Sequence, residues 1–271
     1  MRLAVRHVTR YRFDPPPAHG LQRLRLSPKE THGQQVLEWR MQLAGARIEA
    51  TYDDHNANHV TLVSLEPGAR ELVISCSGLV QTADRAGVLG PHTGQLPLWA
   101  FLAQTPLTRP GAKMRALTAG LAASAEDRLG LLHALSDAVL DGMAYEVGRT
   151  DAGTTAEEAL AAGHGVCQDH AHVFIGCARA LGIPARYVGG YLMMDDRVEQ
   201  DAGHAWAEAH VEGLGWVGFD VSNRISPDAR YIRVASGRDY AEAAPVTGIS
   251  FGGGNSELSV SLAVEQQAVQ Q

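Results

Sequence analysis

Residues 163–184 place a cysteine at the start of a helix, and this segment constrains the fold more than any other. Apolar residues recur there at three- and four-residue steps, at Ala171, Phe174, Ile175, Ala178 and Leu181. This spacing predicts a helix with one buried face, which Gly182 and Pro184 stop. Cys167 stands just ahead, after two glycines that relieve steric crowding where the chain turns into the helix. We therefore expect its thiol at the first helical turn, open to a cleft.

That position suits a nucleophile. The N-terminus of a helix stabilises a thiolate over a thiol and aims free backbone N–H groups at nearby negative charge. The same N–H groups are what an oxyanion hole requires. A lone cysteine is nevertheless more often a small buried hydrophobe, so Cys167 needs partners elsewhere in the chain before the interpretation holds.

Two later segments supply such partners. Residues 204–211 alternate as a strand does, with His204, Trp206, Glu208 and His210 on one face and small apolar residues on the other. A glycine-bearing turn follows, and a second strand then ends at Asp220. The imidazole of His204 would take the thiol proton and later protonate a leaving amine. The carboxylate of Asp220 would fix the tautomer of the imidazole and stabilise its charged form, which completes a predicted catalytic triad.

The spacing of the two strands leaves one geometric question open. A two-residue turn at Gly213 and Leu214 would set Asp220 opposite Ala207 and not opposite His204. A bulge, a longer loop or a diagonal reach of the side chains must close this gap.

These segments resemble the bacterial transglutaminase-like cysteine protease family. The resemblance covers most of the chain: it is clearest in residues 154–192 and 204–223, and it extends to the opening strands and to the run from Ser250 to Gly254. Its motifs are GVCQD at 165–169 with Ala171 and His172, LGIPARYVGGYL at 181–192, HAW at 204–206 with Glu208, and GWVGFD at 215–220. The resemblance implies that Cys167, His204 and Asp220 act as nucleophile, base and orienting acid.

The predicted fold is α+β. Residues 1–85 form an all-β N-terminal domain, because apolar and polar residues alternate through several short runs there. Residues 86–271 form the catalytic domain, a transglutaminase/papain-like core by the resemblance, with the nucleophile helix packed on an antiparallel sheet. Thr155 and Glu158 have the spacing of a capping box, and the glycines at 252–254 indicate a turn or loop.

Other side chains near the predicted site admit two interpretations each. Trp206 and Tyr187 could line a substrate groove or belong to the core. His170 stands where the family resemblance leads us to expect a large apolar residue, commonly Phe, so it could also line the cleft. Asp169 is expected to cap the helix start, and His172 to be a core histidine with a hydrogen-bonded partner.

We expect neither a metal nor another cofactor. His164, Cys167, His170 and His172 lie within nine residues and could suggest zinc. Once the helix begins, however, Cys167 and His172 point to different sides, because each residue turns the helix by about 100°. No calcium-binding loop pattern is present either.

Composition narrows the possible partners and the compartment. The chain has 271 residues, a formal charge of −7 and no long basic run, which argues against nucleic-acid or anionic-membrane binding. Charged residues interrupt the N-terminal apolar positions, and no stretch predicts a membrane span, so we expect a cytoplasmic protein. Its three cysteines are expected to be free, since Cys167 and Cys177 are about 15 Å apart along one helix. Oligomeric state is left open.

The sequence thus predicts a thiol-dependent amide hydrolase, a peptidase or amidohydrolase, that acts on a peptide or protein amide through a thioester acyl-enzyme. Two alternatives stay open. If a primary amine reached the thioester in place of water, the protein would be a transglutaminase. The fold could also serve as a non-catalytic interaction module, which the presence of all three triad residues disfavours.

Overall fold

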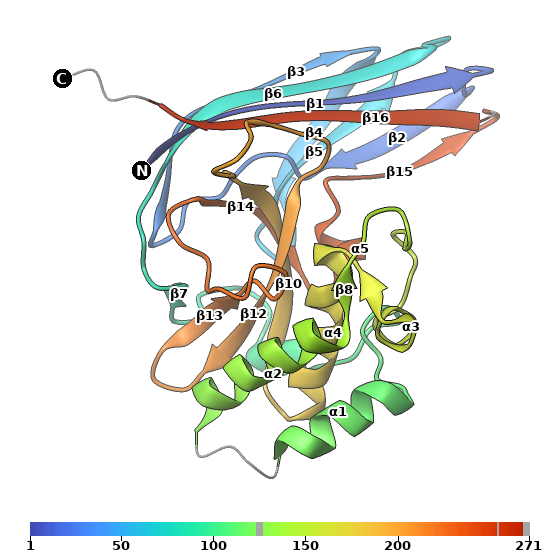
Figure 1. Cartoon of the computed structure of the whole chain (residues 1–271). Helices are drawn as coiled ribbons and strands as arrows, with labels where there is room; N and C mark the ends of the chain where they lie inside the picture. Colours follow the sequence, from blue (N-terminus) through green and yellow to red (C-terminus); the bar gives the residue numbers. More distant parts are fainter. Residues whose placement is uncertain (123–126, 254, 268–271) are drawn as a thin grey trace.

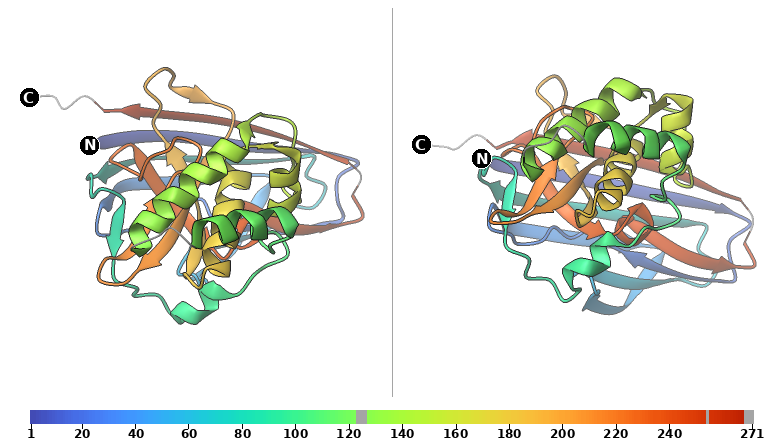
Figure 2. Two further views of the ribbon diagram at one scale, coloured as in Figure 1. Left: turned by 60° about the horizontal axis from the view of Figure 1, so that its bottom comes forward. Right: turned by 90° about the horizontal axis from the view of Figure 1, so that it is seen from below.

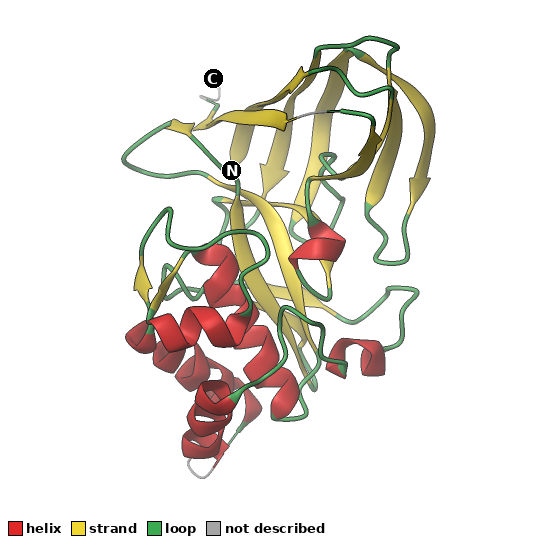
Figure 3. Cartoon of the chain, turned by 90° about the vertical axis from the view of Figure 1, so that its right-hand side faces the viewer, coloured by secondary structure: helices red, strands yellow, loops and turns green. Residues whose placement is uncertain are grey.

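The computed structural model describes residues 1–122, 127–253 and 255–267 (Figure 1). These residues form three larger antiparallel sheets and one short parallel pair. Two sheets lie together at one end of the molecule, and the third carries the helices at the other end (Figure 3). Gly254, the last of the three consecutive glycines, lies outside the described residues.

The two sheets at the first end pack face to face. One has the order β11 (Glu199–Gln200), β16 (Asn255–Gln266), β1 (Arg2–Asp14), β6 (Glu71–Thr82) and β3 (Gln34–Ala44). The other has the order β15 (Val246–Phe251), β2 (His19–Leu24), β5 (His59–Leu65) and β4 (Ala46–Asp53). Alternating apolar residues from both sheets, including Phe13, Leu24, Val63 and Ile74, form the core between them.

The last strands of the chain pair with the first ones. β16 runs antiparallel to β1 from Leu3 opposite Gln266 to Asp14 opposite Asn255, and β15 pairs with β2. The predicted division after residue 85 assigned residues 246–266 to the catalytic part, whereas these strands complete the N-terminal sheets. The N-terminal sheets are therefore built from both ends of the sequence.

The third sheet has the order β14 (Tyr231–Gly237), β10 (Ala185–Leu192), β12 (His204–Val211), β13 (Gly215–Phe219) and β7 (Val88–Gly90). Helix α4 (Cys167–Ala180) lies against this sheet, and α1 (Ala112–Ala122), α2 (Arg128–Gly142) and α3 (Ala156–Ala162) pack around α4 (Figure 2). The remaining short elements are η1 (Leu98–Leu102), α5 (Tyr240–Ala243), β8 (Ala144–Tyr145) and β9 (His164–Gly165). Among the described residues, no helix has the length and apolar character needed to cross a membrane.

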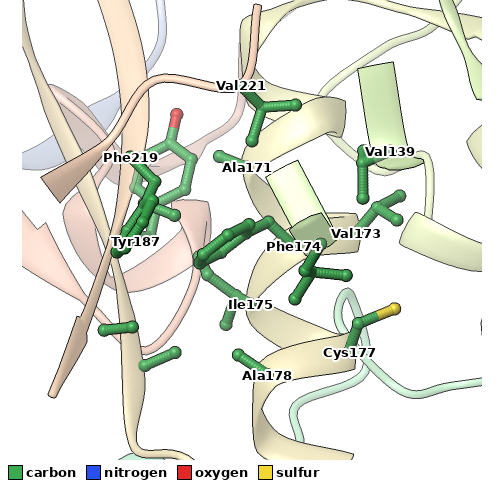
Figure 4. Close-up of a cluster of buried hydrophobic side chains, with 14 of the residues drawn as sticks. Val139, Ala171, Val173, Phe174, Ile175, Cys177, Ala178, Tyr187, Phe219 and Val221 are labelled. Atoms are coloured by element: carbon green, nitrogen blue, oxygen red, sulfur yellow. The ribbon is translucent and has the colours of Figure 1, made fainter. Parts of the chain in front are cut away.

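Helix α4 is held by the apolar stripe that the sequence predicted. Phe174, Ile175 and Ala178 are buried and face Phe219 and Tyr187 of the sheet (Figure 4). The small residues Ala205, Ala207 and Ala209 of β12 belong to the same core, so the helix can approach the sheet closely. This arrangement confirms the predicted α+β fold with its nucleophile helix on an antiparallel sheet.

Buried polar contacts join the third sheet to the N-terminal sheets. Gln34 exchanges two hydrogen bonds with the backbone of Arg233, at 2.7 and 2.8 Å. Asn58 does the same with Ser236, at 2.8 Å each. A buried polar group that loses its hydrogen-bond partner reduces the stability of the fold. These pairs therefore fix how the two parts of the molecule meet.

Candidate active site

Cys167 is the first residue of α4, and the side chain of Asp169 holds the start of that helix. The Asp169 carboxylate accepts hydrogen bonds from the backbone N–H of Val166 at 2.8 Å and from the hydroxyl of Thr150 at 2.7 Å. A side chain at Gly165 would place its Cβ 2.7 Å from the Cβ of Asp169, so glycine is needed there. The local sequence therefore fixes the direction in which the Cys167 side chain leaves the helix.

The first turn of α4 leaves backbone donors free. The N–H groups at the start of a helix have no acceptor within it. In the described part of the chain, no acceptor is found for the N–H groups of Cys167 and Gln168. Both residues line a cavity of about 300 Å³, so these donors lie where a carbonyl oxygen of a bound substrate could receive them.

Asp220 binds His204 directly. The Nε2 atom of His204 lies 2.6 Å from Oδ2 of Asp220, and both side chains are buried. Oδ2 also accepts hydrogen bonds from the Tyr231 hydroxyl at 2.6 Å and from the Asn223 side-chain amide at 2.7 Å. Burial alone would raise the pKa of Asp220, but its hydrogen bond with His204 and the charge of that imidazole bring it below the ordinary value. Asp220 is therefore ionised at neutral pH.

His204 is the link between the carboxylate and the thiol. Burial would lower its pKa, but hydrogen bonds to Asp220 and Cys167, together with their charges, raise it to about 10. Since Nε2 faces Asp220, Nδ1 is the nitrogen left for the sulfur. The sulfur, the imidazole and the carboxylate thus form one hydrogen-bonded chain from α4 across two strands.

The strand register differs from the simple turn considered for the sequence. Ala207 pairs with Phe219 and Val211 with Gly215, so the connecting loop has three residues, 212–214. In this register Asp220 comes level with Trp206 and reaches His204 diagonally on the same face of the sheet. Asp220 leaves the ladder there, because its backbone pairs with Ile225. A longer loop and a diagonal reach together close the gap.

Of the three side chains predicted to contact substrate, only Tyr187 lines the cavity that contains Cys167. Trp206 lies behind the imidazole, with its ring 6.4 Å from that of His204 and 5.4 Å from that of Tyr231. His170 is fully buried, and its Nδ1 lies 2.8 Å from the Ser222 hydroxyl. We therefore correct the sequence-based assignment: Trp206 and His170 support the site from behind, because the strand and helix turn their side chains away from the opening.

The other histidine of the nucleophile helix also has a protein partner. His172 is buried, and its Nε2 accepts the backbone N–H of Tyr240 at 3.0 Å. Burial, with a smaller effect from the charge of Arg179, lowers the pKa of His172 to about 3, so the ring is neutral. Among the described residues, no three acidic, histidine or cysteine side chains form a group that could hold a metal ion.

Three residues of the site are not predicted from the sequence. Asn223 and Tyr231 hold Asp220, and the Tyr145 hydroxyl hydrogen-bonds the sulfur of Cys167. Burial, followed by the nearby charges of Cys167 and Asp220, raises the pKa of Tyr145 to about 12, so the phenol stays protonated and can donate. Tyr145 lies on β8, whose two residues pair with β9, and so short a pairing leaves no periodic signal in the sequence.

Comparison with known proteins identifies the family of this chain. The model of the transglutaminase-like superfamily matches residues 115–221, and that of the bacterial transglutaminase-like N-terminal region matches residues 3–81. An uncharacterized protein of Mycobacterium tuberculosis is 31% identical over 286 residues, which cover 96% of this chain and 90% of the relative. One of Mycobacterium leprae is 28% identical over 285 residues, covering 98% and 99%. The chain therefore belongs to the transglutaminase-like superfamily and carries the bacterial N-terminal region.

A solved structure shows the same fold. A proposed cysteine protease from Cytophaga hutchinsonii superposes with a TM-score of 0.76 at 22% sequence identity. The superposition covers all of this chain and 92% of that protein. The N-terminal sheets and the helix-bearing sheet thus occur together in both proteins.

Proposed function

We propose that this protein is a thiol-dependent amide hydrolase with Cys167 as nucleophile, His204 as acid and base, and Asp220 as the residue that orients His204. The observation that carries the proposal is the hydrogen-bonded chain from sulfur to carboxylate, with Cys167 and His204 both lining the cavity. A half-buried thiol joined to two buried polar side chains at the edge of a cavity is the arrangement expected of a reactive site.

The reaction begins when the sulfur of Cys167 attacks the carbonyl carbon of an amide. His204, whose pKa is raised to about 10, already holds the proton when the sulfur attacks, and the backbone N–H groups of Cys167 and Gln168 receive the developing oxyanion. The carbon–nitrogen bond then breaks while His204 gives its proton to the nitrogen, and the amine leaves. A thioester remains on Cys167.

Water completes the cycle. His204 takes a proton from the water molecule as the oxygen attacks the thioester carbon. The carbon–sulfur bond breaks and the carboxylic acid leaves, while the proton taken from water stays on His204 and restores the resting pair. Asp220 stays ionised throughout and stabilises the imidazolium in both halves of the reaction.

The test uses a library of peptides and small acyl amides, with mass spectrometry of both protein and products. We expect a transient acyl adduct on Cys167 and release of the free acid and amine. Cys167→Ala should abolish both signals, while Cys177→Ala, which removes a buried thiol of the same helix, serves as the matched control. Incorporation of an added primary amine in place of water would identify a transglutaminase, and no adduct with any amide would favour the interaction module.

A further inference from the structure

The cavity beside Cys167 lies between two apolar cores along strand β1. Leu3 and Val5 belong to the core shared with the third sheet, and Phe13 belongs to the core between the N-terminal sheets. Between them His7 and Thr9 point from the same face of β1 into the cavity lining. The N-terminal sheets therefore build one wall of the cavity that Cys167 also lines.

Most of this lining is neutral at physiological pH. His7 is held by the Tyr191 hydroxyl at 2.8 Å and by the Thr9 hydroxyl at 3.0 Å. Burial lowers the pKa of His7 to about 4, so its ring is uncharged. The other walls are mainly aromatic and aliphatic side chains, among them Tyr187, Tyr240, Val234, Val246 and Val260. No aspartate or glutamate is among the described residues that line the cavity.

Besides the imidazole of His204, the charged group of the lining is Arg25, which alone among the lysines and arginines of the described residues lines this cavity. Its side chain is 5% exposed, and Nε donates to Asp54 at 3.0 Å, while Nη1 donates to Thr247 at 3.3 Å. Within the described ranges, Nη2 has no hydrogen-bond partner. A guanidinium carries five N–H donors, so several stay available to a ligand.

Asp54 holds Arg25 from outside the cavity, and its carboxylate oxygens already accept several other hydrogen bonds. Its Oδ1 accepts the backbone N–H groups of Asn56 and Asn58, at 2.9 Å each, and its Oδ2 also accepts the Asn58 amide at 3.1 Å. Asp54 does not belong to the cavity lining. The pair therefore fixes the guanidinium in place but leaves its cavity side without an anion.

We propose that the cavity binds an amide substrate whose inserted part is largely apolar and carries a carboxylate that pairs with Arg25. The inference rests on the proposed function, because the substrate must also present its carbonyl to Cys167. A carboxylate that enters this space loses water and needs a charged donor, which Arg25 supplies. An ammonium group would instead meet two cations, Arg25 and the protonated imidazole of His204.

The test compares matched alkylating probes. Bromoacetamides of a six-carbon chain that ends in a carboxylate, in a carboxamide or in an ammonium group react with Cys167, and mass spectrometry gives the rate for each. The sulfur–carbon bond forms, bromide leaves, and the proton stays on His204. We expect the carboxylate probe to react about 10- to 100-fold faster than the carboxamide probe, and the ammonium probe to react slowest.

Three variants decide whether Arg25 causes this preference. Arg25→Gln should bring the rates of the carboxylate and carboxamide probes together. Arg10→Gln, which removes an outward-facing charge of β1 paired with Glu71, should leave their ratio unchanged. Leu258→Glu places a negative charge at an exposed position of the cavity rim, so it should lower the ratio even if Arg25→Gln fails to fold.

The outcomes separate the two proposals. Equal rates for the carboxylate and carboxamide probes in the wild type, or a ratio that survives Arg25→Gln and Leu258→Glu, would overturn the inference about the carboxylate alone. If no probe modified Cys167 faster than Cys76 and Cys177, the proposed function would fail as well. Cleavage of peptides with a free C-terminus and no acidic side chain, compared with amidated peptides that contain glutamate, then shows which carboxylate Arg25 receives.

Discussion

At the scale of single residues, the candidate site depends on how firmly Asp220 is held. Its two oxygens receive hydrogen bonds from His204, Tyr231 and both the side chain and the backbone of Asn223. A carboxylate with so many donors keeps its charge and its direction, and it imposes both on the imidazole. Asp220 therefore acts on Cys167 through His204, without touching the sulfur itself.

Substituting Asp220 with Asn should reduce amide turnover by roughly a hundred- to ten-thousand-fold, by analogy with serine triads. The amide keeps the shape of the side chain but loses the charge that stabilises protonated His204. Because the three residues act as a unit, Cys167→Ala combined with Asp220→Asn should cost little more than Cys167→Ala alone. Steady-state kinetics of the two single variants and the double variant measure this, and near wild-type turnover for Asp220→Asn would remove Asp220 from the mechanism.

The same substitution should change the pH dependence of stability. The pKa of folded His204, about 10, lies above its ordinary value of about 6.5. Its protonation therefore stabilises the fold fully below pH 6.5, and this contribution disappears as the pH rises towards 10. Urea unfolding of the wild type and Asp220→Asn should show a gap in stability at pH 7 that narrows by pH 10. A gap that stays constant over this range would contradict the role of His204 protonation.

Cys167 should also be the first thiol to react with a limiting dose of iodoacetamide at neutral pH. Cys76 and Cys177 are buried, and burial raises the pKa of each to about 12, so neither forms a thiolate readily. Mass spectrometry of tryptic peptides identifies the labelled residue. Equally fast labelling of Cys76 or Cys177 would show that the nucleophile has been misassigned.

The site residues that could be predicted from the sequence are those that stand in short local patterns. Cys167 precedes a helical stripe, and His204 and Asp220 stand at the ends of strands, so each could be placed on its element. Tyr145 and Tyr231 could not be found in this way, because β8 is too short to show a period and Tyr231 reaches Asp220 across the fold. Arg25 escaped notice for a related reason: its importance follows from a cavity that only the assembled sheets enclose.

At the scale of elements, the N-terminal ends of α3 and α4 can be compared, because a carboxylate caps each of them. Thr155 and Glu158 form the predicted capping box at the start of α3. Asp169 makes the corresponding contact at the start of α4, beside Cys167. Both contacts satisfy backbone N–H groups that a helix cannot satisfy itself, but only the second helix carries the proposed nucleophile.

Asp169→Ala and its counterpart Glu158→Ala each remove the carboxylate that accepts the N-cap N–H, so each should destabilise the protein by about 1 kcal/mol. Only Asp169→Ala should also lower turnover strongly, because it frees Val166 and Thr150 and lets the start of α4 move. Thermal unfolding and turnover, measured on both variants, separate a loss of stability from a loss of positioning. Equal turnover in the two variants would mean that the direction of Cys167 does not depend on Asp169.

The pairing of elements was predicted less well than their existence. Leu258, Val260, Leu262 and Val264 alternate with other residues and so predict a strand, but its partner, β1, lies at the other end of the chain. Alternation shows which face of a strand is buried, but it does not identify the strand that pairs with it. For the same reason the sequence left the register between β12 and β13 open, and the structure had to supply it.

At the scale of the whole molecule, three sheets share their cores. Trp39 of the N-terminal sheets stacks on Tyr191 of the third sheet, with ring centroids 6.3 Å apart. β1 contributes to the core on each side of the cavity, and the Gln34–Arg233 and Asn58–Ser236 contacts are buried between the two parts. Neither part can lose its structure without exposing the other.

The described sheets should therefore unfold as one cooperative unit. In two variants that retain only Trp39 or only Trp216, fluorescence reports the contact between the N-terminal and third sheets in the first and the third sheet itself in the second. We expect the two urea transitions to coincide with each other and with the loss of far-ultraviolet circular dichroism. Two separated midpoints would show that the parts are independent domains.

The pairing of the first strand with the last has a consequence during synthesis. A ribosome makes β1 before the other described strands and β16 after them, so β1 waits for this neighbour while the residues between them emerge. Val246, Leu258 and Val260, which line the cavity, are likewise translated after Cys167 and His204. A nascent chain thus carries both side chains before it has the strands that complete the cavity beside them. Closure of the cavity is therefore a late step of folding, which must wait until β15 and β16 have left the ribosome.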